Sequence, residues 1–264
     1  MRYGAMNSPL HELLQEVETL GALGFDYLEI TMDAPYAHHS VLSQQKTELG
    51  RALKRFEMDL VCHLPTFVST ADLTDSIREA SIQETLNSMQ TAAELGAMKT
   101  VLHPSMIHGL GPMLPDLARR HSTAAMERLL SEAERLGLKV CVENMPPRSF
   151  FLVRPDDFDA FFDHFPKASM TLDTGHAHIE GGTERILSFI RRFPDRIGHV
   201  HASDNRGRSD DHIPIGSGTI DFVKVAKALK AVGYDETITL EVFASDRDYL
   251  VISRNKLERM LAGE

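Results

Sequence analysis

Residues 75–103, DSIREASIQETLNSMQTAAELGAMKTVLH, contain the repeating unit on which the fold depends. Residues 75–95 have the apolar spacing of an amphipathic helix, which starts at Asp75 and stops at Gly96. A glycine just past the last helical residue is the usual helix end. Residues 98–103 then form a short β-rich run that ends in His103. The stretch therefore predicts a helix, a glycine turn and a strand, in that order.

The same unit recurs from one end of the chain to the other. Eight strands, each followed by a helix, in 264 residues predict a single-domain (β/α)8 TIM barrel over residues 1–264. A doubly wound open sheet is the alternative, but no G-x-G-x-x-G follows the first strand, and a count of eight favours closure. The expected strands are 2–6, 27–32, 58–63, 98–103, 138–143, 168–173, 196–201 and 237–242, and the expected helices are 8–20, 41–56, 75–95, 115–136, 155–164, 183–192, 219–231 and 247–261.

Composition narrows the class of protein and its partners. The formal net charge of −10 repels polyanions, so nucleic acid is a disfavoured partner. The two cysteines, Cys62 and Cys141, have no C-x-x-C spacing and fit a reducing compartment. The N-terminal residues have no apolar core of a secretion signal, and no apolar run approaches the about 20 residues that span a bilayer. We therefore expect a soluble, cytoplasmic protein with no membrane partner; whether it forms a homo-oligomer is open.

Six consecutive expected strands have a histidine or an acidic residue at or next to their last position. In a TIM barrel the active site lies at the C-terminal ends of the strands. One histidine at a strand end is more often structural than functional, whereas six such ends in a row indicate a functional site. These residues are His63, His103, Glu143, Asp173, His201 and Glu241.

The alternation of side chains along the strands supports a metal at this rim. Apolar residues precede Asp173, His201 and Glu241, so these three should point into the barrel. Glu143 would then face Glu241 across the mouth, and two carboxylates held that close repel unless a cation lies between them. We expect Glu143, Asp173, His201 and Glu241 to bind a divalent metal. Their oxygen and nitrogen donors suit Mn²⁺, Mg²⁺, Co²⁺ or Zn²⁺, and more than one ion is an open alternative.

The strand-end motifs resemble those of the xylose isomerase-like TIM barrel superfamily. This superfamily holds sugar and sugar-phosphate isomerases and epimerases together with endonuclease IV (AP endonuclease family 2). In the epimerase branch, residues matching Glu143, Asp173, His201 and Glu241 hold one divalent metal. The resemblance further implies that the two glutamates act as acid and base on opposite faces of the substrate. The matching motifs are HLP, HPS, VENMP, LDTGHAH, HASDNRGRSDDHIPIGSGTIDF and LEVF.

The endonuclease IV branch implies a larger ligand set, which holds three zinc ions. Nuclease action needs a basic DNA-binding face, but this chain is acidic, and the loops after the second and third strands carry no Lys or Arg. We therefore favour a divalent-metal-dependent isomerase or epimerase of a small carbohydrate, with proton transfer at the carbon next to a metal-bound carbonyl. A barrel that binds metal or sugar without turnover is a third alternative, which two opposed glutamates disfavour. The sugar, its phosphorylation and the choice between epimerisation and isomerisation are open. Besides the four ligands above, residues of matching type are His63, His103, His176, Asp210 and His212.

The stretch TLDTGHAH, residues 171–178, raises a further expectation. Gly175 should let the chain turn sharply after Asp173, so that His176 points back over the mouth of the barrel. There His176 could join Asp210 and His212, either as a second metal site or as groups that contact the substrate or the ligands. Nothing in the pattern requires His178, which we expect not to be a ligand.

The stretch PIGSGTIDF, residues 214–222, has two interpretations. Gly216, Ser217 and Gly218 precede a helix, where backbone N–H groups can bind a phosphate of the substrate. The alternative, which we favour slightly, is a tight turn that returns the long loop to the rim.

Overall fold

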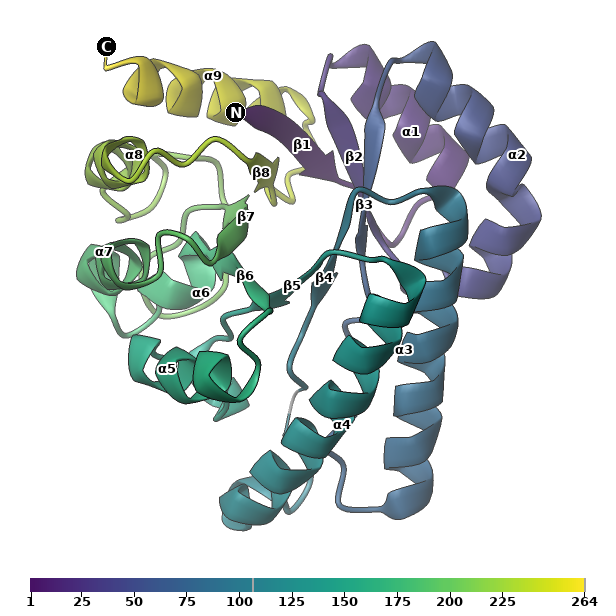
Figure 1. The fold of residues 1–264 in the computed structure, drawn as a ribbon. Helices are drawn as coiled ribbons and strands as arrows, with labels where there is room; N and C mark the ends of the chain where they lie inside the picture. Colours follow the sequence, from purple (N-terminus) through teal and green to yellow (C-terminus); the bar gives the residue numbers. More distant parts are fainter. Residues whose placement is uncertain (106, 264) are drawn as a thin grey trace. The chain divides into compact units, whose positions relative to one another are not determined.

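The computed structural model describes residues 1–105 and 107–263 (Figure 1). Eight parallel strands follow one another in sequence order around a closed barrel, and helices connect them. The predicted (β/α)8 TIM barrel is therefore confirmed, whereas the assignment of the whole chain to one domain stays a prediction. The chain forms two compact units, one of Met1–Met6, Glu143–Pro147 and Leu152–Glu264 and one of Asn7–Val142 and Arg148–Phe151.

The unit that contains Asn7–Val142 carries the helix–glycine–strand stretch from which the fold was inferred. Its third helix spans Asp75–Leu95 and ends at Gly96, whose φ of 74° is left-handed. The next helix ends in the same way at Gly137, with φ 69°. The predicted glycine stop at Gly96 is therefore confirmed. The elements that begin in this unit are α1 (Leu13–Ala22), β2 (Tyr27–Thr31), α2 (His39–Arg55), β3 (Asp59–His63), α3 (Asp75–Leu95), β4 (Lys99–Leu102), η1 (Gly111–Met113), α4 (Pro115–Leu136) and β5 (Val140–Glu143).

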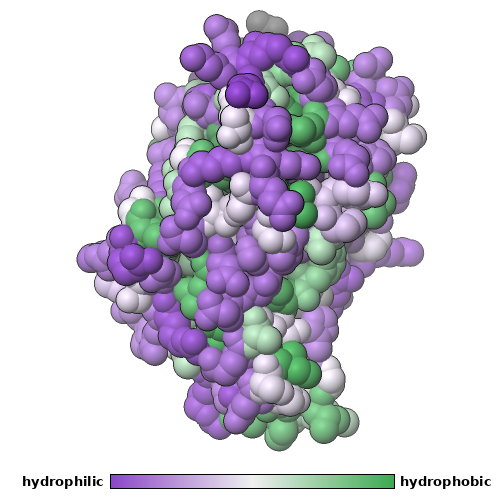
Figure 2. All heavy atoms as spheres, turned by 90° about the vertical axis from the view of Figure 1, so that its right-hand side faces the viewer, coloured by the Kyte–Doolittle hydropathy of each residue, from purple (hydrophilic) through white to green (hydrophobic). Residues whose placement is uncertain are grey.

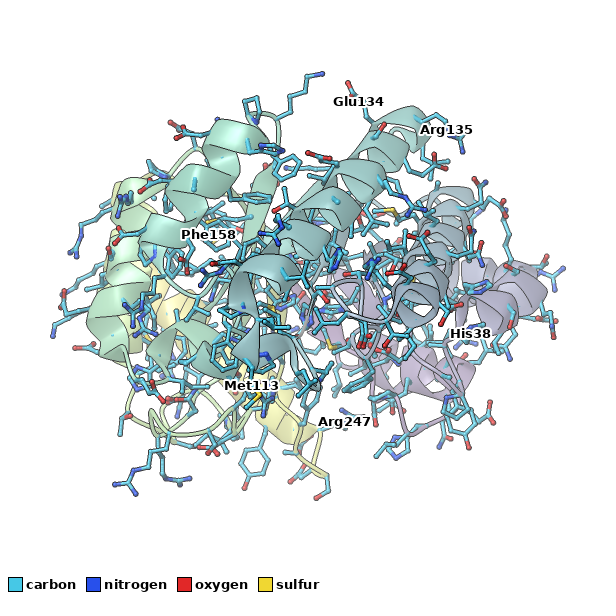
Figure 3. All side chains as sticks on the ribbon, turned by 90° about the horizontal axis from the view of Figure 1, so that it is seen from below. His38, Met113, Glu134, Arg135, Phe158 and Arg247 are labelled. Carbon is cyan, nitrogen blue, oxygen red and sulfur yellow. The ribbon has the colours of Figure 1, made fainter. Side chains whose placement is uncertain are left out.

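The unit that contains Leu152–Glu264 is held together in part by a group of phenylalanines. The Phe158 ring is fully buried and meets the Phe189 ring edge-on, with 5.5 Å between ring centroids (Figure 3). Phe162 and Phe193 pack beside them. Such edge-to-face contacts add to the hydrophobic gain of burial and pack α5 against α7. The elements here are β1 (Arg2–Met6), α5 (Pro155–His164), β6 (Ser169–Asp173), α6 (Thr174–His178), α7 (Gly182–Arg192), β7 (Ile197–Ala202), α8 (Phe222–Ala231), β8 (Thr237–Leu240) and α9 (Asp248–Ala262); η2 (Pro147–Ser149) follows β5.

The first helix starts later than its apolar pattern predicts. The prediction placed its start at residue 8, but α1 begins at Leu13. The backbone N–H of Ser8 donates to Oε2 of Glu16 at 2.7 Å, so the carboxylate of the helix holds the preceding turn. Glu16 therefore stabilises the turn before the helix. Hydrophobic periodicity does not reveal this contact.

The hydropathy of the surface and of the helices bears on a membrane location. Figure 2 shows a face on which hydrophilic side chains predominate and hydrophobic ones form only small groups. Within the described residues, every helix is too short or too polar to cross a bilayer.

Candidate active site

Three neighbouring strands bring three of the predicted ligands to one place. Asp173 on β6 lies in register with His201 on β7, and His201 lies in register with Thr239 on β8. Register partners in parallel strands point to the same face of a sheet. Glu241 comes two residues after Thr239, and its backbone N–H donates to the carbonyl of Ala202 at 3.2 Å, so it continues the same face.

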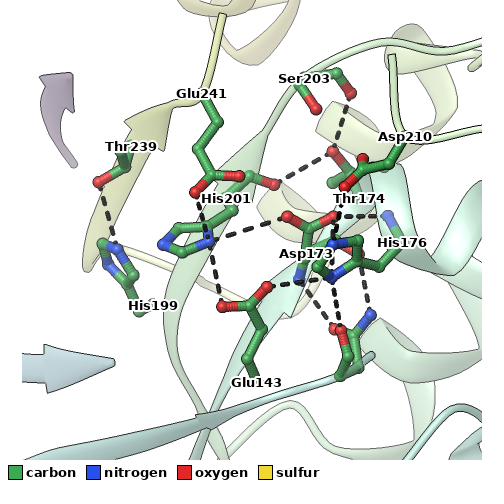
Figure 4. Close-up of polar contacts among 12 residues, drawn as sticks. Glu143, Asp173, Thr174, His176, His199, His201, Ser203, Asp210, Thr239 and Glu241 are labelled. Atoms are coloured by element: carbon green, nitrogen blue, oxygen red, sulfur yellow. Dashed lines mark hydrogen bonds and ion pairs between the residues drawn. The ribbon is translucent and has the colours of Figure 1, made fainter. Parts of the chain in front are cut away.

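These side chains converge on one atom, Nδ1 of His201 (Figure 4). Glu241 Oε1 lies 3.2 Å from this nitrogen, and Glu143 Oε2 lies 3.4 Å from it. Asp173 Oδ2 lies at 3.8 Å. In Figure 4 the two glutamates reach His201 from opposite sides. All four side chains are almost completely buried, so the cluster lies where charges interact strongly.

Asn144 holds this cluster in place, and sequence reasoning gave it no role. Its amide nitrogen donates to the carbonyl of Asp173 at 3.0 Å, and its amide oxygen accepts from the N–H of Asp173 at 2.8 Å. The carbonyl of Asn144 accepts from Nδ1 of His176 at 2.9 Å. One amide therefore ties the end of β5 to the end of β6. Its position directly after Glu143 in VENMP was the only available signal.

The chain leaves β6 through a short helix rather than the expected sharp glycine turn. Residues Thr174–His178 form α6, and Oδ1 of Asp173 caps it by accepting from the N–H of His176 at 2.6 Å. Gly175 matters for space rather than for backbone freedom. A Cβ there would lie 3.0 Å from Ser203 Oγ and 3.3 Å from the amide nitrogen of Asn205. The cap and the close approach together set the direction of His176.

His176 lies at the cluster and contacts Asp210, which in turn contacts His212. Its Nδ1 is 3.0 Å from Glu143 Oε1, and its Nε2 is 3.1 Å from Asp210 Oδ2. His212 Nε2 lies 3.0 Å from the same oxygen of Asp210. Asp210 therefore sits between two imidazoles, although the role of these three residues stays a prediction. His178 turns away, with its Nε2 2.8 Å from Thr219 Oγ1.

The buried carboxylates hold protons strongly when no cation is present. Burial raises the pKa of Glu241 to about 8, and the nearby Asp173 and Glu143 add to the rise, against the opposing effect of His201. Burial likewise raises the pKa of Asp173. A bound cation would therefore displace protons from the cluster and stabilise the carboxylate forms.

The Asp210 group titrates in the opposite sense. Burial alone would raise the pKa of Asp210, but hydrogen bonds from His176 and His212 hold it well below its usual range. Burial alone would lower the pKa of His212, but Asp210 and Glu241 raise it to about 9. Burial alone would also lower the pKa of His176, but the surrounding carboxylates raise this pKa well above its ordinary value. In the absence of a cation these imidazoles therefore carry positive charge against the acidic cluster.

The cluster fits a divalent metal by its donors and by an unsatisfied atom. Ligand atoms of Asp173, His201 and Glu241 lie within 4.8 Å of one another, and so do those of Glu143, Asp173 and His176. Oδ2 of Asp173 is buried and receives no hydrogen bond from the described residues. Carboxylate oxygens with imidazole nitrogen are donors that Mn²⁺, Co²⁺, Zn²⁺ and Mg²⁺ accept.

His63 and His103 lie together in the unit that contains Asn7–Val142. His63 is the last residue of β3, and His103 follows β4 directly. Their rings meet edge-on with 4.8 Å between centroids, and Nδ1 of His63 donates to the carbonyl of Leu64 at 2.9 Å. Their role as additional metal or substrate ligands stays a prediction.

The amides of the PIGSGTIDF turn already have partners within the chain. Oδ2 of Asp204 accepts from the N–H groups of Gly216 and Gly218, both at 2.9 Å. Oδ1 of Asp204 accepts from Ile220 at 3.1 Å, and the N–H of Ser217 donates to the carbonyl of Pro214. The geometry thus favours the tight turn over phosphate binding. Helix α8 starts at Phe222 rather than at residue 219, with Asp221 as its cap.

Replacement of Asp204 by alanine should destabilise the protein. The N–H groups of Gly216, Gly218 and the buried Ile220 would lose their acceptor, so we expect the free energy of unfolding to fall by at least about 2 kcal/mol. Asp221→Ala is the matched comparison, because Asp221 caps α8 by accepting from the backbone N–H of Lys224 at 3.1 Å and pairs with Nζ of the same residue. Its loss should lower stability by about 1 kcal/mol. Denaturant unfolding measures both values, and an Asp204 effect no larger than that of Asp221 would contradict this account of the turn.

Fold and site together define a (β/α)8 barrel with buried carboxylates and histidines gathered at the ends of its strands. The chain matches the xylose isomerase-like TIM barrel family over residues 17–260 and belongs to that family.

Individual relatives come from both branches of the family. An uncharacterized protein of Methanocaldococcus jannaschii is 27% identical over 87% of this chain and 78% of its own length. L-ribulose 3-epimerase of Methylomonas sp. is 27% identical over 84% of this chain and 76% of its own. The crystal structure of a D-tagatose 3-epimerase-like protein superposes with a TM-score of 0.89 at 26% identity, over 99% of this chain and 97% of that one. A probable endonuclease 4 of Aquifex aeolicus is 24% identical over 86% of each chain.

Proposed function

We propose that this protein is a divalent-metal-dependent epimerase or isomerase of a small carbohydrate. The observation that carries the proposal is the pair of buried carboxylates, Glu143 and Glu241, on opposite sides of His201 (Figure 4). The likeness to sugar epimerases supports the same reaction class.

The residues of the cluster share two proton transfers, one from a substrate carbon and one to it. Glu143, Asp173, His201 and Glu241 would hold the metal, which when bound acts as a Lewis acid that polarises a carbonyl. One glutamate removes the proton from the carbon beside that carbonyl, and the other returns a proton from the other face. The burial of both carboxylates excludes water and so protects the carbanionic stage of the substrate.

The group of His176, Asp210 and His212 positions the substrate in this proposal. Both imidazoles hold Asp210 Oδ2, so their N–H groups have fixed directions beside the cluster. The same group is the observation that favours the alternative function, an endonuclease IV-like abasic-site nuclease, because that activity uses a larger metal set. The net charge of −10 opposes tight DNA binding and favours the sugar.

A substrate screen separates the two functions. The protein, stripped of metal and then loaded separately with Mn²⁺, Co²⁺, Zn²⁺ or Mg²⁺, is incubated with a panel of ketoses and aldoses and with an abasic-site duplex. We expect conversion of at least one free sugar and no tight binding to the duplex at physiological salt. Submicromolar duplex binding followed by metal-dependent cleavage, with no sugar converted, would reverse the assignment.

His176→Ala should lower turnover of the sugar at least about tenfold, because an outer partner of the metal ligands would be lost. His178→Ala is the matched control from the same helix, and it should change turnover little, since Nε2 of His178 pairs with Oγ1 of Thr219. Steady-state kinetics on folded variants with verified metal content provides the measurement. A damaging His178 change beside a silent His176 change would refute the assignment of this helix.

A further inference from the structure

A second group of metal-type ligands lies outside the cluster described above. His38 and His39 stand at the start of α2, and Glu84 lies on α3, all within the unit that contains Asn7–Val142. Their ligand atoms lie within 4.8 Å of one another. Figure 3 labels His38, whose side chain is 32% exposed. Ions in the surrounding water can therefore reach the group.

Both imidazoles direct Nε2 at the same carboxylate oxygen. Oε1 of Glu84 is 2.7 Å from Nε2 of His38 and 3.4 Å from Nε2 of His39. This oxygen is shielded from solvent and receives no hydrogen bond of good geometry from the described residues. In an ordinary ion pair an imidazole N–H would point at the Glu84 oxygen. A bound cation requires only that the lone pairs of the two Nε2 atoms and of this oxygen point to one place.

The ring of His38 is already oriented as a ligand would be. Its Nδ1 accepts from the backbone N–H of Ser40 at 3.3 Å as the cap of α2, and lies 2.8 Å from Oγ of Ser40. An ion on Nε2 would require the proton to sit on Nδ1, where Oγ of Ser40 can accept it, as an oxygen commonly does for a metal-binding histidine. The ring centroids of His38 and His39 are 4.2 Å apart, and Nε2 of each ring lies near the same oxygen of Glu84.

We propose that His38, His39 and Glu84 bind one Zn²⁺ ion, with water completing the coordination. Two imidazole nitrogens and one carboxylate oxygen form a donor set that zinc accepts readily, with an open position where the site meets solvent. The dipole at the start of α2 disfavours a cation. The Glu84 carboxylate offsets that effect, and the ion links the start of α2 to α3.

Zinc stoichiometry tests the site directly. Chelator-treated protein is titrated with ZnCl₂, and bound zinc per chain is determined by calorimetry and elemental analysis. His38→Asn removes Nε2 while leaving a side chain that can still cap α2. Glu84→Gln removes the carboxylate from the other helix. We expect each variant to bind one zinc ion fewer per chain than the unaltered protein.

His11→Ala is the matched control, because His11 pairs with Glu16 at 2.9 Å and belongs to no group of three possible metal ligands among the described residues. Its zinc count should equal that of the unaltered protein. Equal counts in the unaltered protein, His38→Asn and Glu84→Gln would overturn the proposal and leave an ordinary histidine–glutamate pair. The experiment counts bound zinc and not turnover. Its outcome therefore does not depend on the proposed sugar chemistry.

Discussion

Glu143→Gln and Glu241→Gln should each lower kcat for sugar conversion by about a hundredfold or more. Glutamine keeps an oxygen in the same place but neither takes nor gives a proton in this pH range. Acid–base catalysis by a positioned side chain contributes about 10²–10⁴-fold, so the loss of either partner should remove most of the rate. Glu134→Gln on the surface of α4 is the control, and its activity should stay unchanged (Figure 3).

The two variants should also differ from each other in the epimer whose hydrogen they exchange with solvent. A merely structural defect would not produce this difference. If one glutamate serves each face of the substrate, each variant keeps the carboxylate for the other face. In D₂O each should therefore still exchange the substrate hydrogen from one epimer only, without forming product. Exchange into both epimers at the normal rate in either variant would contradict the two-base assignment.

Asp173→Ala combined with Glu143→Ala should remove the bound metal and the activity together. These residues supply two of the three buried carboxylates around Nδ1 of His201. Without them, too few oxygen donors remain for a divalent ion. The paired change also avoids leaving one carboxylate to repel the other. Elemental analysis gives the metal content, and full occupancy in the double variant would refute the ligand assignment.

Metal affinity should rise with pH up to about 8. In the metal-free protein the pKa of Glu241 is raised to about 8, so below that pH this carboxyl is protonated. An ion must displace the proton, because only the carboxylate form is a ligand. Apparent affinity should therefore fall by up to about tenfold for each pH unit below 8. Calorimetry in buffers of different ionisation enthalpy detects the released proton, and an affinity independent of pH between 6 and 8 would contradict this picture.

The barrel could be predicted from the sequence because the residues that end its helices act locally. Gly96 and Gly137 end their helices in the left-handed conformation that the pattern requires. The ends of the parallel strands then collect polar residues at one rim. Asp173 and His201 were grouped for this reason, and their register bears out that they lie side by side.

The parts that could not be predicted depend on contacts between distant segments. The amide of Asn144 pairs with Asp173, 29 residues away in the sequence. Asp204 binds the turn at Gly216 and Gly218, so the glycines that suggested phosphate binding face a carboxylate instead. No local sequence pattern predicts the Asn144–Asp173 bond or the bonds from the turn to Asp204. The helical turn after Asp173 was missed because its cap can also start an ordinary turn.

The most direct test of the central claim is proton exchange between solvent and sugar. Metal-loaded protein is incubated in D₂O with the ketose that gives the highest conversion, and deuterium in the recovered sugars is located by NMR. The account predicts one deuterium at the carbon beside the carbonyl, in both substrate and product, and none after Glu143→Gln, Glu241→Gln double replacement. Conversion without deuterium at that carbon, or the absence of any conversion beside cleavage of abasic DNA, would contradict it.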